Sequence, residues 1–161
     1  MASFVFNVAK GRTHEFHLRV DNNDPANSAL IVVVLSATNL ETDSVLRDYD
    51  TLSALLAGAS DEVTNTNYAR KTLTDSSLSA PTIDDTNDRV VLPFPTQTWT
   101  AVASGTSWRK LLICYDSDTT TGTDANIIPV AAYDLLISNA PIIPTGADIV
   151  ISGSDGWLIA R

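Results

Sequence analysis

The carboxylates that follow the apolar run at 111–115 are the first candidates for chemistry in this sequence. Asp116, Asp118 and Asp124 lie in a threonine-rich stretch that also contains Gly122. Hard cations bind several carboxylates on a sharply turning backbone, so this composition suggests a calcium loop. The spacing argues against it, because the glycine stands one place late and no acidic residue closes the loop. We therefore interpret the stretch as a loop of Asx turns and expect no metal.

A second acidic group, formed by Asp84, Asp85 and Asp88, could bind a cation or perform acid–base chemistry. It lies in a Thr- and Asn-rich stretch with no histidine nearby, so a solvated turn is the simpler interpretation. Asp88 can also form a local ion pair with Arg89, of a kind that contributes little to stability. No nucleophile–base constellation is recognisable in the sequence. We expect no enzymatic activity, no catalytic residue and no cofactor.

The histidines, His14 and His17, are the remaining candidates for metal ligands. They would share one face of a helix but would point to opposite faces of a strand. Apolar and polar residues alternate over 16–20, which predicts a half-buried strand, although a short helix from Thr13 would also be tolerated. Since no third ligand is apparent, we expect surface or interface histidines.

The charge of the chain argues against one large class of partners. Ten Lys and Arg against nineteen Asp and Glu give a net charge of −9. This balance repels phosphate backbones, and we expect no nucleic-acid partner. The charge is uneven, since residues 1–20 carry +2 whereas the segment from Asp116 to the C-terminus carries −5. The basic N-terminal part could therefore dock on an acidic neighbour.

Cysteine content and hydropathy narrow the expected setting of the protein. Cys114 is the only cysteine, so a disulfide framework is excluded, and its place in an apolar run predicts a packed, unreactive thiol. The N-terminus has no basic segment ahead of its apolar one, and no apolar run approaches about 18 residues. We expect neither secretion nor a membrane partner.

The pattern of apolar residues predicts a mainly β (α+β) fold. A chain of 161 residues is expected to form one domain, 1–161. The unbroken β-branched run at 29–35 predicts a central strand buried on both faces. We predict a single β-sandwich or barrel-like domain. Further short strands are expected at 4–8, 89–92, 98–102 and 111–115.

Three other segments complete the expected organisation. Apolar residues at three- and four-residue steps predict one packed amphipathic helix over about 44–57. The polar region 61–88 predicts a long loop that a partner could order. Within the C-terminal segment 138–161, the runs 147–151 and 156–159 predict a closing hairpin.

Aromatic and basic residues form the candidate partner interface. Trp108 is the foremost candidate, because small polar residues precede it and two basic residues follow it in what should be an exposed loop tip. The alternative is that its ring folds back onto its own sheet. The full set of expected interface residues is Phe4, Phe6, Lys10, Arg12, Arg19, Trp108, Arg109, Lys110 and Trp157.

Long runs of the sequence carry a family resemblance. They are AKGR at 9–12, DNNDPANSALIVVVL at 21–35, LRDYDTLSALL at 46–56, NYARKTLTD at 67–75, DDTNDR at 84–89 and KLLICYDSDTTTGTDANIIP at 110–129. Over roughly residues 4–135, the chain resembles a family of small virion-associated proteins of tailed bacteriophages, found among head and tail morphogenesis products. The C-terminal segment, which includes Pro141 and Pro144, departs from the family pattern.

The resemblance implies a non-enzymatic component that is made in the bacterial cytoplasm and incorporated into the virion. Our leading hypothesis is a capsid decoration (cement) protein that binds the major capsid protein and bridges capsomers. It would form homo-oligomers, with trimers as the expected order, and residues 1–20 would touch the shell. One alternative is a head–tail connector or tail structural protein. Another is a host-surface or glycan-binding module that uses its aromatic residues as stacking platforms.

Overall fold

The β-branched run of the sequence forms the middle of the main sheet in the computed structural model, which describes residues 3–153 and 158–160. Its strand, β2 (Ala29–Ser36), is buried along its whole length, so the predicted central strand is confirmed. The other elements, in chain order, are β1 (Ser3–Val5), η1 (Asn7–Ala9), α1 (Thr13–Asp21), α2 (Asp43–Leu46), α3 (Leu52–Leu56), β3 (Lys71–Leu73), η2 (Asp75–Ser77), β4 (Thr82–Asp84), β5 (Arg89–Leu92), β6 (Gln97–Trp99), β7 (Trp108–Asp116), β8 (Ile128–Asp134), β9 (Leu136–Ile137), β10 (Ala140–Pro141), β11 (Ile149–Ile151) and β12 (Leu158–Ala160).

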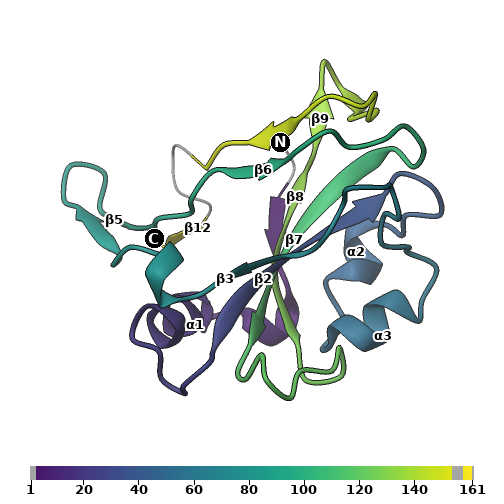
Figure 1. Cartoon of the computed structure of the whole chain (residues 1–161). Coiled ribbons are helices and arrows are strands. Elements are labelled where there is room, and N and C mark those ends of the chain that lie inside the picture. Colours follow the sequence, from purple (N-terminus) through teal and green to yellow (C-terminus); the bar gives the residue numbers. More distant parts are fainter. Residues whose placement is uncertain (1–2, 154–157, 161) are drawn as a thin grey trace.

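The main sheet has the strand order β1-β8-β7-β2-β3, and each neighbouring pair is antiparallel (Figure 1). Its longest pairing joins β2 to β7, from Ala29 opposite Asp116 to Leu35 opposite Lys110. A ribbon of β6 and β11 crosses above this sheet, and β4, β5 and β12 form another small sheet at one side. The prediction of a mainly β fold with a small helical part is confirmed.

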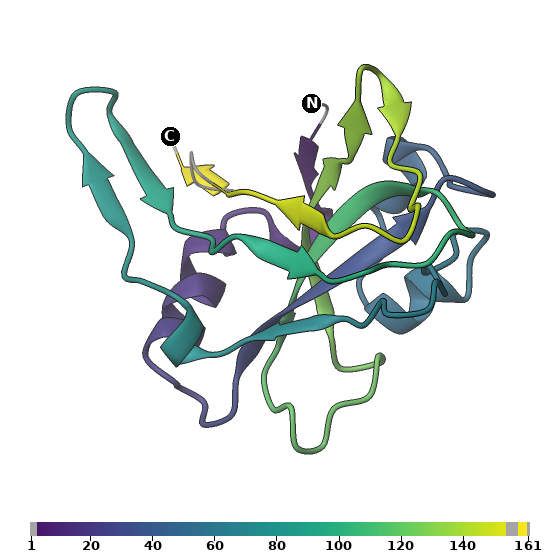
Figure 2. The same cartoon turned by 45° about the horizontal axis from the view of Figure 1, so that its top comes forward.

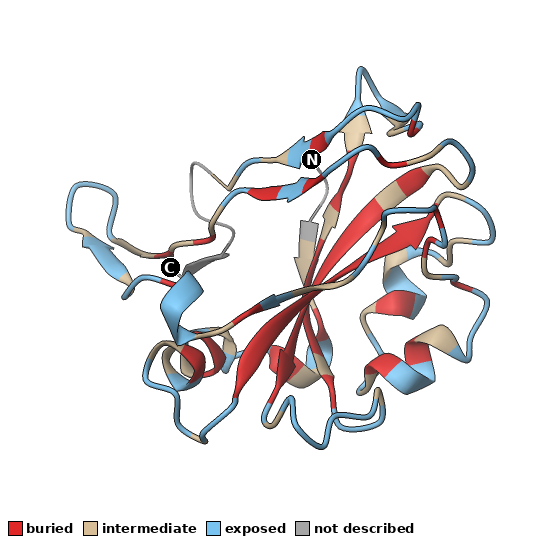
Figure 3. Ribbon diagram, in the orientation of Figure 1, coloured by how far each residue is buried: buried red, intermediate tan, exposed pale blue. Residues whose placement is uncertain are grey.

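Both faces of the main sheet are covered, as the burial colouring in Figure 3 shows. On one face, Val32 and Val34 pack in a cluster with residues of α1 and β6. On the other face, Val33, Leu35 and Cys114 pack with residues of α2 and α3. Fully burying one such aliphatic side chain contributes about 1.5–3 kcal/mol, which explains why an aliphatic strand occupies the centre.

The segment predicted as a half-buried strand near the histidines is the helix α1, so that prediction is wrong and the helical alternative is correct. Phe16 and Val20 are buried, whereas Leu18 between them is only partly buried. Residues four apart share a helix face, whereas residues two apart share a strand face. The buried pair therefore fits both patterns, and Leu18 is the residue that distinguishes them.

The helix predicted over 44–57 is two short helices, α2 and α3, so the prediction of one continuous helix is wrong. The break falls before Thr51, which has an extended backbone and whose Oγ1 accepts a hydrogen bond from the backbone N–H of Ala54, at 3.1 Å. This is the geometry of a helix N-cap. The leucines of both helices still pack in one cluster against the sheet.

The region 61–88 and the C-terminal segment both contribute strands to sheets. The region 61–88 contains β3, which pairs with β2, as well as η2 and β4. In the C-terminal segment, β11 pairs with β6 and β12 pairs with β5. The predicted closing hairpin is therefore wrong, because its two strands pair with distant partners. Figure 2 shows the β4–β5 hairpin standing away from the body of the molecule, and we call it the β4–β5 arm.

Candidate functional site

The acidic loop between β7 and β8 uses its carboxylates to bind its own backbone and hydroxyls. Asp116 Oδ1 accepts from the N–H of Asp118 at 3.1 Å. Asp118 in turn accepts from Thr120 N and Oγ1 at 3.0 and 2.6 Å, and from Thr121 Oγ1 at 3.0 Å. These hydrogen bonds lower the pKa of Asp118. Within the described residues, no group of three or more His, Cys, Asp or Glu is arranged to hold a metal ion.

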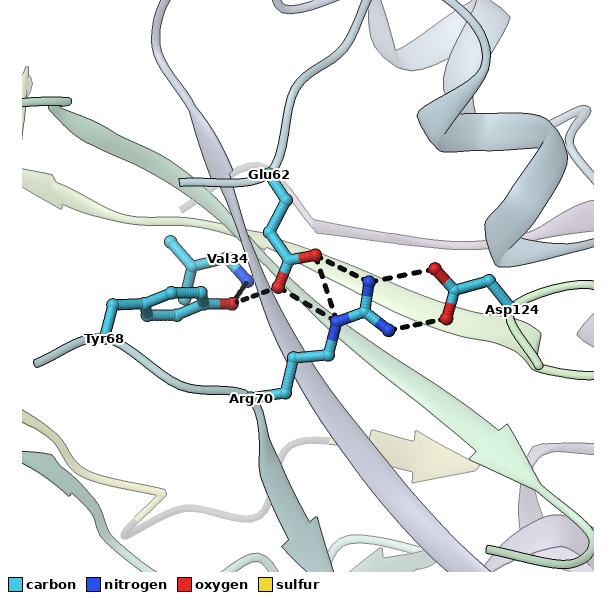
Figure 4. Close-up of polar contacts among 5 residues, drawn as sticks. All are labelled: Val34, Glu62, Tyr68, Arg70 and Asp124. Carbon is cyan, nitrogen blue, oxygen red and sulfur yellow. Dashed lines mark hydrogen bonds and ion pairs between the residues drawn. The ribbon is translucent and has the colours of Figure 1, made fainter. Parts of the chain in front are cut away.

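A network centred on Arg70 joins the same loop to the edge of the main sheet (Figure 4). The Arg70 guanidinium donates to Glu62 from Nε (2.9 and 3.0 Å) and Nη2 (2.6 Å). It also donates to Asp124 from Nη1 (2.6 Å) and Nη2 (3.0 Å). Two forked pairs on one guanidinium are strong, directional contacts. Arg70 lowers the pKa of Asp124, and the hydrogen bonds to both carboxylates raise the pKa of Arg70.

The network also completes the edge of β2. The pairing of β3 with β2 ends at Val32, so the backbone of Val34 needs other partners. Its N–H donates to the Tyr68 hydroxyl at 3.0 Å, and its carbonyl accepts from Val63 N at 3.0 Å. The Tyr68 hydroxyl donates onward to Glu62 at 2.8 Å. Burial and the neighbouring Glu62 raise the pKa of Tyr68. We name the four side chains Glu62, Tyr68, Arg70 and Asp124 the Arg70 clamp, and its geometry is that of a structural tie.

The second acidic group lies in the turn of the β4–β5 arm. Asp84 accepts from Arg89 Nε at 2.7 Å and from Asn87 Nδ2 at 2.8 Å, and these hydrogen bonds, with that of Asn87 the larger cause, lower its pKa. The ion pair of Arg89 is thus made with Asp84, in place of the expected Asp88. The two acidic groups lie on separate elements, because Asp84 ends β4 whereas Asp116 ends β7.

The two histidines of α1 face different surroundings. His14 is exposed, whereas His17 is buried with its Nε2 3.0 Å from the carbonyl oxygen of Ser79. Burial lowers the pKa of His17. This contact ties α1 to the start of the β4–β5 arm. A small, partly open pocket of about 10 Å³ beside His17 has room for one water at most.

Trp108 is not the exposed interface residue that its neighbours suggested. It is the first residue of β7 and is 0% exposed. Its Nε1 donates to Asn65 Oδ1 at 3.1 Å, and its ring meets that of Trp99 edge-on, with centroids 5.2 Å apart. The prediction is therefore wrong, and the alternative, a ring packed on its own sheet, is correct. No local pattern points to Asn65 as its partner, since Asn65 lies 43 residues away along the chain.

Two more of the expected interface residues are buried. Phe6 packs under α2 and α3. The ammonium of Lys110 lies between Asp134 Oδ1 (2.5 Å) and Asp43 Oδ1 (2.9 Å), so both neighbouring elements neutralise it. A buried lysine needs such partners, since an unpaired buried charge is strongly unfavourable. An interface role for these side chains is therefore contradicted by their burial in the protein's own core.

The other expected interface residues have varied positions. Phe4 and Arg109 are partly buried, and Nη1 of Arg109 lies 3.1 Å from Oδ1 of Asp134. Lys10, Arg12 and Arg19 are exposed at η1 and α1, where both arginines hold Glu15. Trp157 lies outside the described residues. Lys10, Arg12 and Arg19 are the exposed cations of this set, and we name them the α1 basic face.

Exposed aliphatic side chains are a feature that the sequence analysis missed. The largest exposures belong to Ile83 (77%), Ile143 (67%), Ile137 (64%), Val150 (60%) and Val45 (45%). Ile83 lies on the β4–β5 arm, Val150 lies on β11, and Ile143 lies between β10 and β11. No local pattern in the sequence marks them, since Ile83 stands next to Asp84 and Val45 lies between Asp43 and Arg47. A large apolar residue that stays exposed on a strand is a candidate contact for a partner.

Within the described residues, no helix combines the length and apolar character needed to cross a membrane. Comparisons of the chain with protein-family models, with curated proteins and with solved structures give no match.

Proposed function

We propose that this chain is a structural protein of a tailed-bacteriophage virion, specifically a decoration protein that binds the outside of the capsid and bridges capsomers. The observation that carries the proposal is the β4–β5 arm. It projects from the body and exposes 77% of Ile83 (Figure 2). An arm that presents a large aliphatic side chain away from its own core is suited to seating in a neighbouring subunit.

The helix α1 lies beside the foot of this arm, since His17 on α1 contacts the chain at Ser79 just before β4. On a chain of net charge −9, the α1 basic face suits an acidic partner surface. Arm and basic face together define a shell-contact surface, which we assign to the major capsid protein as the partner.

Stabilisation of the shell would follow from mass action. A ligand that binds only the assembled state stabilises that state by RT ln(1 + [L]/Kd) at each site. Weak binding repeated over a whole capsid would add up to a large effect. The proposed role therefore needs neither a catalytic group nor a cofactor.

A glycan-binding role receives less support from the aromatic residues. Stacking platforms need exposed rings, and both Trp99 and Trp108 are packed in the core. A head–tail connector remains the alternative within the virion, and copy number separates the two. Hundreds of copies in each particle favour decoration, whereas about a dozen favour a connector of ring symmetry.

The test uses heads that lack the protein, to which the purified chain is added back. Wild type should co-sediment with the heads and increase their resistance to heat and osmotic shock. Ile83→Asp should lower binding by at least about tenfold, because a charge would enter an apolar seat. Val45→Asp is the matched control, since Val45 is an exposed aliphatic residue on α2, away from the arm.

Two results would refute the proposal. One is that heads with and without the wild-type chain resist heat and osmotic shock equally. The other is that Ile83→Asp and Val45→Asp bind the heads as well as wild type does, which would remove the arm from the contact.

A further inference from the structure

The upper layer of the molecule is a ribbon built from two distant parts of the chain. Residues 97–108 run beside residues 142–151, joined by the β6–β11 pairing and by the mutual hydrogen bonds of Trp108 and Ile142 at 2.8 and 2.9 Å. We name these two segments the outer ribbon. Figure 1 shows them crossing above the main sheet.

The two faces of the outer ribbon differ sharply. Its inner face supplies Trp99, Val102, Trp108 and Ile149 to the core. Its outer face is polar but uncharged around positions 98–101, and it exposes 60% of Val150. Ile143, between β10 and β11, is 67% exposed. The side chains of β11 thus alternate between a buried and an exposed aliphatic position, as in a strand with one face unpaired.

The outer ribbon is almost free of charge, although the chain as a whole is strongly acidic. The stretch 90–108 contains no charged residue, and Asp148 is the one charged residue in the stretch 135–153. The carboxylate of Asp148 accepts a hydrogen bond from Ala101 N at 2.8 Å, so it is engaged by the ribbon itself. Elsewhere the surface carries the charges that give the chain −9.

This distribution of charge favours a second copy of the chain as the partner of the outer ribbon. Two copies of a chain with net charge −9 repel each other, and the repulsion is smallest where the facing surfaces carry no charge. A second copy brings the same uncharged ribbon and the same exposed aliphatic residues. A two-fold axis makes such a surface self-complementary, which is the commonest arrangement in homo-oligomers.

We infer that the outer ribbon is a self-association surface through which two copies of this chain pack, with Val150 and Ile143 at the contact. Burying these side chains removes apolar surface from water, and Asp148, which is already engaged by Ala101 N, is the one charged group of these two stretches that the contact has to accommodate. The inference is independent of the proposed decoration role, because the α1 basic face and the β4–β5 arm are not part of the ribbon.

The experiment is sedimentation equilibrium of the full chain over a range of concentrations, which reports both the mass of the complex and its dissociation constant. Wild type should reach the mass of two chains. Val150→Asp and Ile143→Asp should each raise the dissociation constant by at least about tenfold, because each places an acidic group against an acidic partner. Thermal unfolding checks that the variants remain folded, and both sites are exposed enough to tolerate the change.

Ile83→Asp serves as the control, because Ile83 is exposed to a similar or greater degree but lies outside the ribbon. It should associate as wild type does. A wild-type chain that stays at the mass of one copy at every concentration would overturn the inference, as would a complex of three chains. So would ribbon variants that associate normally but bind heads poorly, since that result would make the shell protein the occupant.

Discussion

Arg70 connects three places that are distant along the chain. It binds Glu62 before β3 and Asp124 in the β7–β8 loop, and through Glu62 it orients the Tyr68 hydroxyl that completes the edge of β2. The guanidinium is partly buried, so its ion pairs are less screened than pairs in open water. This one side chain therefore holds an acidic loop against the sheet that the loop leaves.

Removing Arg70 should destabilise the protein and change its response to acid. Arg70→Ala leaves the two carboxylates without their partner, and we expect a loss of about 1–3 kcal/mol in the free energy of unfolding near neutral pH. The pKa of Asp124 is lowered in the folded state, so its contribution is present above its unfolded pKa of about 4 and is lost as pH falls below that value. Wild type should lose stability over this acid range more steeply than the variant does.

Urea unfolding monitored by tryptophan fluorescence at several pH values measures both effects. Arg12→Ala is a suitable control, because Arg12 makes a solvent-exposed pair with Glu15, and such pairs contribute little. Equal acid slopes for wild type and Arg70→Ala would contradict the assigned role of the Arg70 clamp.

The positions of individual side chains show how far residue type alone can predict a site. Lys110 and Trp108 are of residue types that are common in interfaces. Their burial depends on partners from other elements, which are Asp134 and Asp43 for Lys110 and Asn65 for Trp108. No local sequence pattern indicates such partners. The buried, unreactive Cys114 was predicted correctly, because the apolar run around it is itself the signal.

At the scale of elements, the N-cap with which α3 begins separately from α2 can be tested directly. Thr51 caps this helix through its hydroxyl, and helix caps of this kind contribute about 0.5–2 kcal/mol. Thr51→Ala should therefore lower stability by about 1 kcal/mol and increase amide hydrogen exchange in α3. Ser53→Ala, at an exposed position two residues further on, should leave both unchanged or slightly improved, since alanine favours helix. If both variants behaved alike, Thr51 would not be the cap.

Strands and helices differed in how well the sequence predicted them. The strand β2 could be predicted, because an unbroken run of β-branched residues is typical of a strand that is buried on both faces. The helix α1 was predicted only as the alternative to a strand, because its buried residues four apart also satisfy a two-residue period. The closing hairpin was wrong for another reason: β11 and β12 pair with β6 and β5, and non-local pairing leaves no trace in a local pattern.

At the scale of the whole molecule, charge is separated from the surface inferred to self-associate. Repulsion between two acidic copies weakens with ionic strength, since the Debye length falls from about 30 Å at 0.01 M salt to about 10 Å at 0.1 M. Self-association through the outer ribbon should therefore strengthen several-fold over this range, as measured by sedimentation. Association that weakens with salt would indicate contacts between opposite charges instead.

Binding to the shell should respond in the opposite direction. The α1 basic face is assigned to an acidic neighbour, so its attraction is screened by salt. One protein would then show two associations with opposite salt dependence, and the two surfaces could be examined separately by choosing the buffer.

The sealed position of Cys114 gives this protein a practical advantage for spectroscopy. Its thiol is shielded by the main sheet and by the two short helices, and burial raises its pKa, so the reactive thiolate is scarce. A cysteine introduced at Val150 or at Ile83 would be the accessible thiol for a maleimide dye or a nitroxide, with the natural one left in place. Distances between labels on two copies, or between a label and a capsid, could then be measured without altering the core.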